Sequence, residues 1–263
     1  MFRLLALLLN LLFVTTLHAA ESPAVAAAAD LKFALSEAAA LFEKETGQRL
    51  RLAFGSSGNF TQQIESGAPF ELFLSADEQF VFRLAGKRLT VDNGALYAVG
   101  RIVLFAPHGS PLQPDAAQTE PLGAIRSAIA DGRLRRFAIA NPEHAPYGRA
   151  ARSALRHAGL WEAIEGKLVY GENAAQAMQF AASGSSQGGI VPLSLSRAPE
   201  VARQGRFTII PSEWHADEPL RQRMVLLRGA GATAKAFYAW LQQPVARALL
   251  SRHGFNLPEG GAR

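Results

Sequence analysis

Short apolar segments alternate with amphipathic segments along most of the chain, and this alternation limits the possible folds more than any other feature of the sequence. The pattern first appears where an apolar run (Ala24–Ala29) is followed by Asp30 and by apolar residues spaced three or four apart up to Phe42. The run predicts a buried strand, and the spacing predicts a helix. Strands that alternate with helices over short loops predict an α/β fold with mostly parallel sheets.

The same pattern repeats further along the chain. Apolar runs predict strands at residues 49–54, 72–74, 98–106, 137–140, 168–170, 189–191 and 224–227. Amphipathic spacing predicts helices at residues 60–66, 77–85, 149–158, 174–182 and 234–253. So many strands exceed what one doubly wound sheet usually holds in a chain of 263 residues, and we therefore expect two lobes.

The lobes are expected to divide the chain unequally. We predict that residues 21–104 and 222–263 form one lobe and that residues 105–221 form the other. The stretch from Pro107 to Pro121 is rich in Pro and Gly, which is typical of a passage between lobes. In such a fold a ligand binds in the cleft between lobes, beside the carboxyl ends of strands.

The first twenty residues predict export. Arg3 precedes an apolar run from Leu4 to Val14, and small residues follow at Ala19 and Ala20. This order is typical of a secretory signal peptide (residues 1–20) that is cleaved after Ala19 or Ala20. A membrane anchor is the alternative, but the run is shorter than the ~20 apolar residues that span a bilayer.

Composition excludes several classes of site. The chain has no cysteine, which rules out disulfides, thiolate zinc sites, iron–sulfur clusters and a cysteine nucleophile. None of the six histidines stands at metal-ligand spacing from another, so we expect no metal cation site. The net charge of +5 suggests an acidic partner, but export and the scattered basic residues argue against nucleic acid.

Four predicted strand-to-helix turns carry the candidate site. They are AADLKFAL (Ala28–Leu35), FGSSGNF (Phe54–Phe60), NPEHAPYGRAA (Asn141–Ala151) and ENAAQA (Glu172–Ala177). The start of a helix presents unpaired amides and a partial positive charge. Several such starts, with Ser and Tyr hydroxyls beside them, can bind an oxyanion without any lysine. For any single turn, ordinary helix capping is the simpler explanation.

These segments resemble the periplasmic molybdate-binding proteins of ABC importers, and the resemblance runs from about Val25 to Leu257. Its most specific strings are GAPFELFLSAD and NPEHAPYG, and YAVGRIVLFAP and KAFYAWLQQP add to it. The resemblance implies a type II periplasmic binding protein fold: two α/β lobes, joined by a hinge of two crossover strands, that close on molybdate or tungstate. It also implies a periplasmic monomer that is not an enzyme, needs no cofactor and delivers its anion to a permease in the inner membrane.

Carried over residue by residue, the resemblance places the ligand-binding groups in the four turns. The predicted ligand-binding residues are Ala29, Asp30, Ser56, Ser57, Tyr147 and Ala174, the last through its amide.

Asp30 departs from the pattern of the family, whose members more often have Ser, Thr or Asn at this position. A carboxylate beside a dianion repels it unless one of the two carries a proton. Asp30 could therefore turn away and cap the following helix, contact the ligand through its amide alone, or accept a hydrogen bond from a protonated oxyanion. Of the three we favour the helix cap.

Two other functions are also compatible with the sequence. A receptor for another oxyanion, such as a phosphate-like anion, would use the same acceptor geometry. A serine hydrolase using Ser57 is the enzymatic alternative, but the Gly55 to Gly58 turn lacks the spacing of a nucleophile elbow, and no His and Asp partners are evident.

Overall fold

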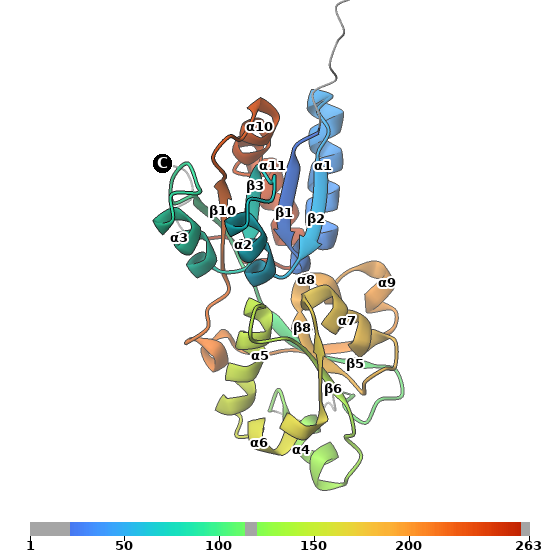
Figure 1. Ribbon diagram of the computed structural model, residues 1–263. Coiled ribbons are helices and arrows are strands. Elements are labelled where there is room, and N and C mark those ends of the chain that lie inside the picture. The colour runs from blue at the N-terminus through green and yellow to red at the C-terminus, as the bar shows by residue number, and fades with distance from the viewer. Residues whose placement is uncertain (1–21, 114–119, 259–263) are drawn as a thin grey trace, which may run out of the picture.

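The computed structural model describes residues 22–113 and 120–258, which form two lobes, each built on one five-stranded sheet (Figure 1). The predicted two-lobed α/β architecture is confirmed. The predicted signal peptide and its cleavage site lie outside the described residues. Within the described part of the chain, no helix is long and apolar enough to cross a membrane.

The first lobe holds the sheet β2-β1-β3-β10-β4. Its strands are β1 (Ala24–Ala28), β2 (Arg51–Gly55), β3 (Leu72–Ser75), β4 (Ala95–Val99) and β10 (Arg221–Leu226). The helices α1 (Lys32–Thr46), α10 (Ala232–Trp240) and α11 (Pro244–Arg252) pack with one apolar cluster, and α2 (Ser57–Glu65) and α3 (Glu78–Gly86) pack with another. β1 is buried along its whole length, which explains why it reads as an uninterrupted apolar run.

The second lobe holds the sheet β7-β6-β8-β5-β9. Its strands are β5 (Ile102–Pro107), β6 (Phe137–Ala140), β7 (Leu168–Gly171), β8 (Gly189–Pro192) and β9 (Gly205–Ile209). Its helices are α4 (Gly123–Ala130), α5 (Pro146–His157), α6 (Trp161–Ile164), α7 (Ala174–Ala182), α8 (Leu193–Ser196) and α9 (Pro199–Ala202). Three short 3-10 helices complete the molecule: η1 (Ala29–Leu31), η2 (Glu165–Lys167) and η3 (Ser212–His215).

Both sheets are mixed, whereas the sequence predicted mostly parallel sheets. β1 pairs in parallel with β2 and β3, but β10 pairs antiparallel with β3 and β4. The second sheet repeats this arrangement, with β5 antiparallel to both β8 and β9. The antiparallel strands are those that lead into or out of the passages between lobes, so the chain reverses direction where it changes sheet.

The chain passes between the lobes earlier than predicted. The apolar run 98–106, expected to be one strand, belongs to β4 and β5 in different sheets. All of β5 pairs in the second lobe, so the passage lies between Val99 and Ile102, and the stretch after Pro107 lies within the second lobe. The return passage joins β9 to β10, and the two passages touch where the Gly100 amide donates to the Leu220 carbonyl at 2.8 Å.

The predicted helix at 234–253 is two helices, α10 and α11. Pro244 stands at the first turn of α11, where its missing N–H costs nothing, but it could not continue α10. Phe42 of α1 meets Phe237 and Trp240 of α10 edge to face, with ring centroids 5.1 and 6.1 Å apart. These contacts fix the C-terminal helices on the first lobe.

Candidate functional site

The four turns that the sequence singled out meet at the junction of the lobes. They surround a narrow space of about 190 Å³, which includes volume open to solvent. It is lined from the first lobe by Ala28, Ala29, Asp30, Gly55, Ser56, Ser57 and Ala76, and from the second lobe by Ala145, Pro146, Tyr147 and Ala174. All six predicted ligand-binding residues therefore lie around one space, because β1, β2, β6 and β7 all end at the junction.

The start of α2 supplies two serines with different hydrogen bonds. Ser56 is the N-cap, and its hydroxyl accepts from the Asn59 amide at 3.3 Å and lies 3.0 Å from His144 Nδ1. Ser57 is fully buried, and its hydroxyl oxygen accepts from the Ala76 amide at 2.9 Å. The Ser57 hydroxyl hydrogen is not used by that bond and can be donated to a ligand.

Asp30 faces the junction and does not cap a helix, so the interpretation that we favoured from the sequence is wrong. Neither η1 nor α1 has a side-chain cap. The carboxylate instead accepts hydrogen bonds at Oδ2 from Gln222 Nε2 at 2.6 Å and from the Tyr147 hydroxyl at 2.9 Å. Two partners from distant parts of the sequence hold Asp30 more firmly than a local cap would.

Burial controls the charge state of Asp30, which is only 1% exposed. Loss of solvent raises the pKa of its carboxyl from 3.8 to about 6, although the hydrogen bonds from Gln222 and Tyr147 and the amide of Asp30 itself lower it. Oδ1 of the same carboxyl is buried and makes no hydrogen bond to any described residue. The site therefore contains one carboxylate oxygen with no donor facing it.

Tyr147 bridges the lobes. It stands in the first turn of α5, and in the structure its hydroxyl donates to Asp30, while the sequence predicted donation to a ligand. Burial and the nearby Asp30 carboxylate raise the pKa of Tyr147 well above 10, so it stays a neutral donor. A side chain at Gly100 would occupy the place of this hydroxyl, which explains a glycine in the passage between β4 and β5.

Two residues of this network were missed by the sequence analysis. Gln222 of β10 and Tyr97 of β4 are both buried, and the Tyr97 hydroxyl donates to Gln222 Oε1 at 2.7 Å. That bond fixes the side-chain amide of Gln222 so that its Nε2 faces Asp30. Both residues lie one or two positions before a predicted strand, 98–106 for Tyr97 and 224–227 for Gln222, and away from every candidate turn, so no local signal marked them.

The start of α7 brings Ala174 to the site. The Asn173 side chain accepts from the amides of Ala175 and Gln176 at 3.0 and 3.1 Å. Ala174 occupies the first position of the helix, where an amide has no acceptor within the helix itself. Its amide is therefore suited to bind an anion.

Further contacts hold the lobes together around the space. The Gly58 amide donates to the His144 carbonyl at 2.9 Å, and Asn59 pairs with Glu172. Arg149 of α5 pairs with Asp77 of the first lobe, and its Nε donates to Glu218 at 2.8 Å. In this structure the two lobes are therefore in direct contact with each other.

Among the residues that the structure describes, no histidine hydrogen-bonds to Ser57. His144 contacts Ser56, and the Ser57 oxygen is engaged by the Ala76 amide. Across residues 22–113 and 120–258, no cluster of His, Asp or Glu could hold a metal ion. The arrangement suits binding of a small anion by neutral donors.

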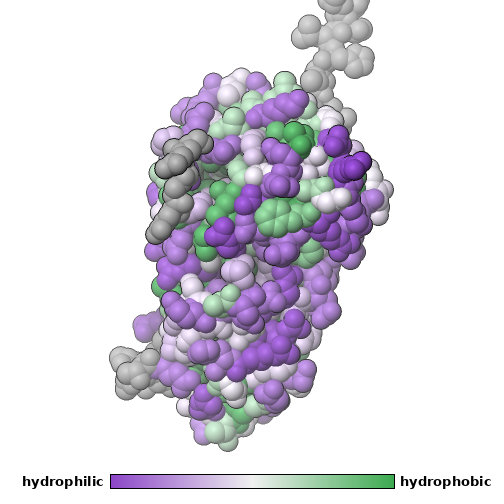
Figure 2. All heavy atoms as spheres, turned by 90° about the vertical axis from the view of Figure 1, so that its left-hand side faces the viewer, coloured by the Kyte–Doolittle hydropathy of each residue, from purple (hydrophilic) through white to green (hydrophobic). Residues whose placement is uncertain are grey.

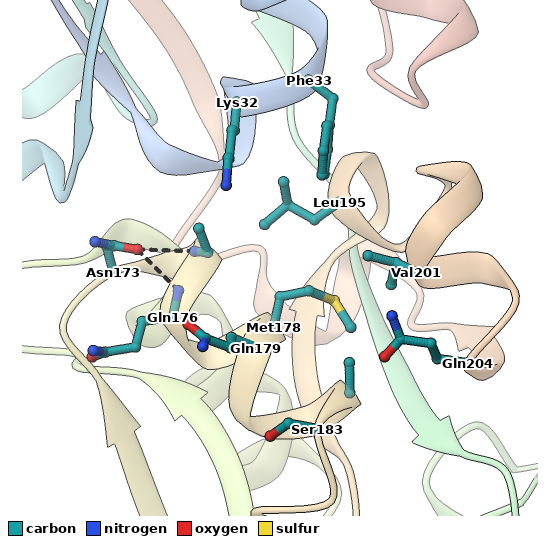
Figure 3. Close-up of a pocket in the computed structure, with 12 residues that line it drawn as sticks. Lys32, Phe33, Asn173, Gln176, Met178, Gln179, Ser183, Leu195, Val201 and Gln204 are labelled. Carbon is teal, nitrogen blue, oxygen red and sulfur yellow. Dashed lines mark hydrogen bonds between the residues drawn. The ribbon is translucent and has the colours of Figure 1, made fainter.

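A larger groove lies on another side of α7 (Figure 3). It contains about 980 Å³ of empty space that is open to solvent, between the start of α1 and the helices α7, α8 and α9. Lys32 and Phe33 point into it from the first lobe, and Met178 and Gln204 line it from the second (Figure 3). None of the predicted ligand-binding residues lines this groove.

Comparison with known proteins agrees with this architecture. Residues 23–256 match the family described as bacterial extracellular solute-binding protein. The chain is 35% identical to the molybdate-binding protein ModA of Azotobacter vinelandii over 241 residues, or 89% of each chain. It is also 35% identical to ModA of Rhodobacter capsulatus over 251 residues, covering 94% of this chain and 93% of that protein.

A solved structure of a molybdate-binding protein has the same fold as this chain. The periplasmic molybdate-binding protein of Azotobacter vinelandii superposes with a TM-score of 0.80 at 28% identity, covering 90% of this chain and 100% of that one. The family resemblance and the two-lobed binding-protein fold predicted from the sequence are therefore confirmed. This chain belongs to the bacterial extracellular solute-binding proteins and is related, along most of its length, to molybdate-binding members of that family.

Proposed function

We propose that this protein is a periplasmic receptor that captures molybdate between its two lobes and delivers it to the permease of an ABC importer. One observation carries the proposal: four strand-to-helix turns from two lobes meet around one small buried space. The names of the relatives, both molybdate-binding proteins, support the choice of anion.

The donors around the space fit a small oxyanion. The Ser57 hydroxyl and the amides at the starts of α2 and α7 are neutral donors at the positive ends of helices. Hydrogen bonds to a charged acceptor are about twice as strong as those between neutral groups, and the near-absence of solvent strengthens them further. We propose Ala29, Asp30, Ser56, Ser57, Tyr147 and Ala174 as the ligand-binding residues, with Tyr147 acting partly through Asp30.

Tungstate presents the same tetrahedral arrangement of acceptor oxygens, so we propose that it binds at the same site. We propose that binding is reversible and breaks no bond in the anion, and that the protein acts as a monomer without enzymatic activity or cofactor. A phosphate-like anion is the second candidate, and the unpartnered Asp30 oxygen favours it because such an anion can carry a hydrogen to that oxygen.

Thermal unfolding and calorimetry test the proposal. A ligand that binds only the folded state at a thousandfold excess over its Kd stabilises the protein by about 4 kcal/mol, or roughly 10 °C in Tm for a chain of this size. Molybdate and tungstate are expected to produce such a shift, and a metal chelator is expected to produce none. Absence of a shift with both anions, together with a clear shift with phosphate, would replace molybdate by the second candidate.

A further inference from the structure

The observation that goes beyond the proposed function is the asymmetry of the Asp30 carboxyl. Oδ2 accepts two hydrogen bonds, from Gln222 and Tyr147, whereas Oδ1 is equally buried and accepts none. Asp30 lines the small space directly. A buried acceptor without a donor is destabilising, and more so when an anion is placed beside it.

No other residue that the structure describes supplies the missing donor, and the amide of Asp30 itself lowers the pKa of the carboxyl but makes no hydrogen bond to Oδ1. Gln222 Nε2 and the Tyr147 hydroxyl are both engaged with Oδ2, and the Tyr97 hydroxyl is engaged with Gln222. The Ser194 hydroxyl donates to the Asp30 backbone carbonyl at 2.9 Å. A hydrogen that faces Oδ1 must therefore come with the ligand or from solvent.

Few ionisable groups surround Asp30. The elements packed against η1 include α1, α7, α8 and β2, and β10 and α5 reach the Asp30 side chain through Gln222 and Tyr147. Arg221 and Arg223 of β10 pair with Glu78, and Arg149 of α5 pairs with Asp77 and Glu218. Neither α7 (AAQAMQFAA) nor α8 (LSLS) has an ionisable side chain. Lys32 at the start of α1 is exposed, and Arg51 stands at the opposite end of β2 from Gly55, beside Ala24. Tyr97 and Tyr147 stay protonated at neutral pH, because burial raises the pKa of each well above 10.

We propose that the site binds its oxyanion together with one proton, which is held between Asp30 Oδ1 and an oxygen of the anion. This inference rests on the proposed function and adds to it that Asp30 determines specificity. The proton comes from solvent, one hydrogen bond forms, and no bond within the anion breaks. A neutral Asp30 that donates to a dianion and an ionised Asp30 that accepts from a monoprotonated anion contain the same atoms, so both give one proton taken up per anion bound.

The proton removes the conflict between two negative charges in a buried space. It also requires the bound anion to place one of its oxygens against Asp30 Oδ1. Affinity for such an anion must then fall as the pH rises, because the free proton becomes scarcer.

Calorimetry of molybdate binding in several buffers tests the proposal, because buffers with different ionisation enthalpies report the number of protons taken up. At pH 7.5 the wild-type protein is expected to take up about one proton per anion, and its Kd is expected to rise about tenfold per pH unit between pH 7.5 and 8.5. Asp30→Asn keeps an acceptor for Gln222 and Tyr147 and places an amide donor at the Oδ1 position. Its proton uptake is expected to be near zero and its Kd independent of pH.

His144 is the matched control, since its imidazole ring lies 3.0 Å from Ser56 at the edge of the site. The proton uptake is expected to persist in His144→Gln. Wild-type binding without proton uptake, or uptake that is lost in His144→Gln and retained in Asp30→Asn, would overturn the inference. Either result leaves molybdate binding intact, whereas failure of the wild-type protein to bind molybdate would contradict the proposed function itself.

Discussion

At the scale of single residues, Asp30 controls the electrostatics of the site. It is buried, it connects the lobes through Tyr147, and its second carboxyl oxygen is unpartnered. Because its pKa is raised from 3.8 to about 6, its contribution to folding stability is fully present below pH 3.8 and is lost as the pH rises through 6. Above pH 6 the ligand-free protein therefore contains a buried ionised carboxylate.

The first prediction is that Asp30→Asn stabilises the ligand-free protein increasingly as the pH rises. Asn does not titrate, so its advantage over Asp is expected to grow between pH 4.5 and 7.5 by about 2 kcal/mol, because pH 4.5 already lies above the ordinary pKa of 3.8 and only part of the displacement to about 6 falls in this range. Urea unfolding of both proteins at the two pH values measures this difference. Stability curves that stay parallel over this range would show that Asp30 titrates normally.

The second prediction concerns Ser57. Ser57→Ala removes a hydroxyl donor to the anion and is expected to weaken molybdate binding by roughly 1.5–3 kcal/mol, or about 10- to 150-fold. It also leaves the buried Ala76 amide without its acceptor, so some loss of stability is expected. Calorimetry measures the affinity.

Ser153→Ala provides the control for Ser57. Ser153 is also buried and bonds to Asp217 and Trp214, but it lies outside the site. The Ser153→Ala variant is expected to be less stable than the wild-type protein and to bind molybdate with the same affinity. Equal affinities for Ser57→Ala and the wild-type protein would remove Ser57 from the binding set.

The sequence predicted which residues meet but not how they bond. Short motifs in the four turns identified Ser57, Tyr147 and Asp30, since each motif marks a helix start. The partner of the Asp30 side chain depended on Gln222, which is 192 positions away in the sequence. A local rule for helix capping cannot include such a partner, and this is why the cap interpretation failed.

At the scale of elements, the start of α2 fits closely against the second lobe. The Gly58 amide donates across the lobes to the His144 carbonyl, and a Cβ at Gly58 would lie 2.7 Å from that carbonyl oxygen. Real Cβ atoms do not approach backbone so closely. The glycine therefore allows the two lobes to come together at the anion.

The third prediction is that Gly58→Ala weakens molybdate binding by at least about tenfold, because the lobes can no longer close at the start of α2. The matched control is Gly86→Ala at the end of α3, where a Cβ would meet no neighbour within 4 Å and the backbone is not left-handed. Calorimetry on both variants measures the effect. Full affinity in Gly58→Ala would mean that the bound form does not need this contact.

Elements were predicted well where the pattern was local and less well at the passages between lobes. The apolar run 98–106 gave no sign of the change of sheet, because only Gly100 and Arg101 separate the apolar end of β4, which is partly buried, from the buried strand β5. The break between α10 and α11 did have a sequence signal in Pro244, which favours the first turn of a new helix.

At the scale of the whole molecule, polar contacts join the lobes around the site. Arg149 pairs with Asp77 and Glu218, and its guanidinium also lies over the Phe80 ring. The face of the molecule in Figure 2 is mainly hydrophilic, with hydrophobic residues in small areas among polar ones.

The fourth prediction is that Arg149→Met destabilises the protein by roughly 2–4 kcal/mol at pH 7.5, because it leaves the buried Asp77 carboxylate without its cation. Burial already raises the pKa of Asp77, so the loss is expected to be smaller at acidic pH, where Asp77 takes up a proton. Urea unfolding at the two pH values measures both losses of stability.

Arg126→Met is the control, because it removes an exposed ion pair with Glu120. It is expected to lower the free energy of unfolding by less than about 1 kcal/mol. Equal losses in Arg149→Met and Arg126→Met would show that the buried Asp77 carboxylate does not depend on Arg149.

If an oxyanion binds where the four turns meet, a crystal structure with molybdate will show the anion there. Molybdenum scatters anomalously, so its position can be located without reference to the protein side chains. At a molybdate concentration that saturates binding in solution, we expect one strong anomalous peak in the space lined by Asp30, Ser57, Tyr147 and Ala174. A peak only in the groove beside α7, or no peak between the lobes, would contradict the account.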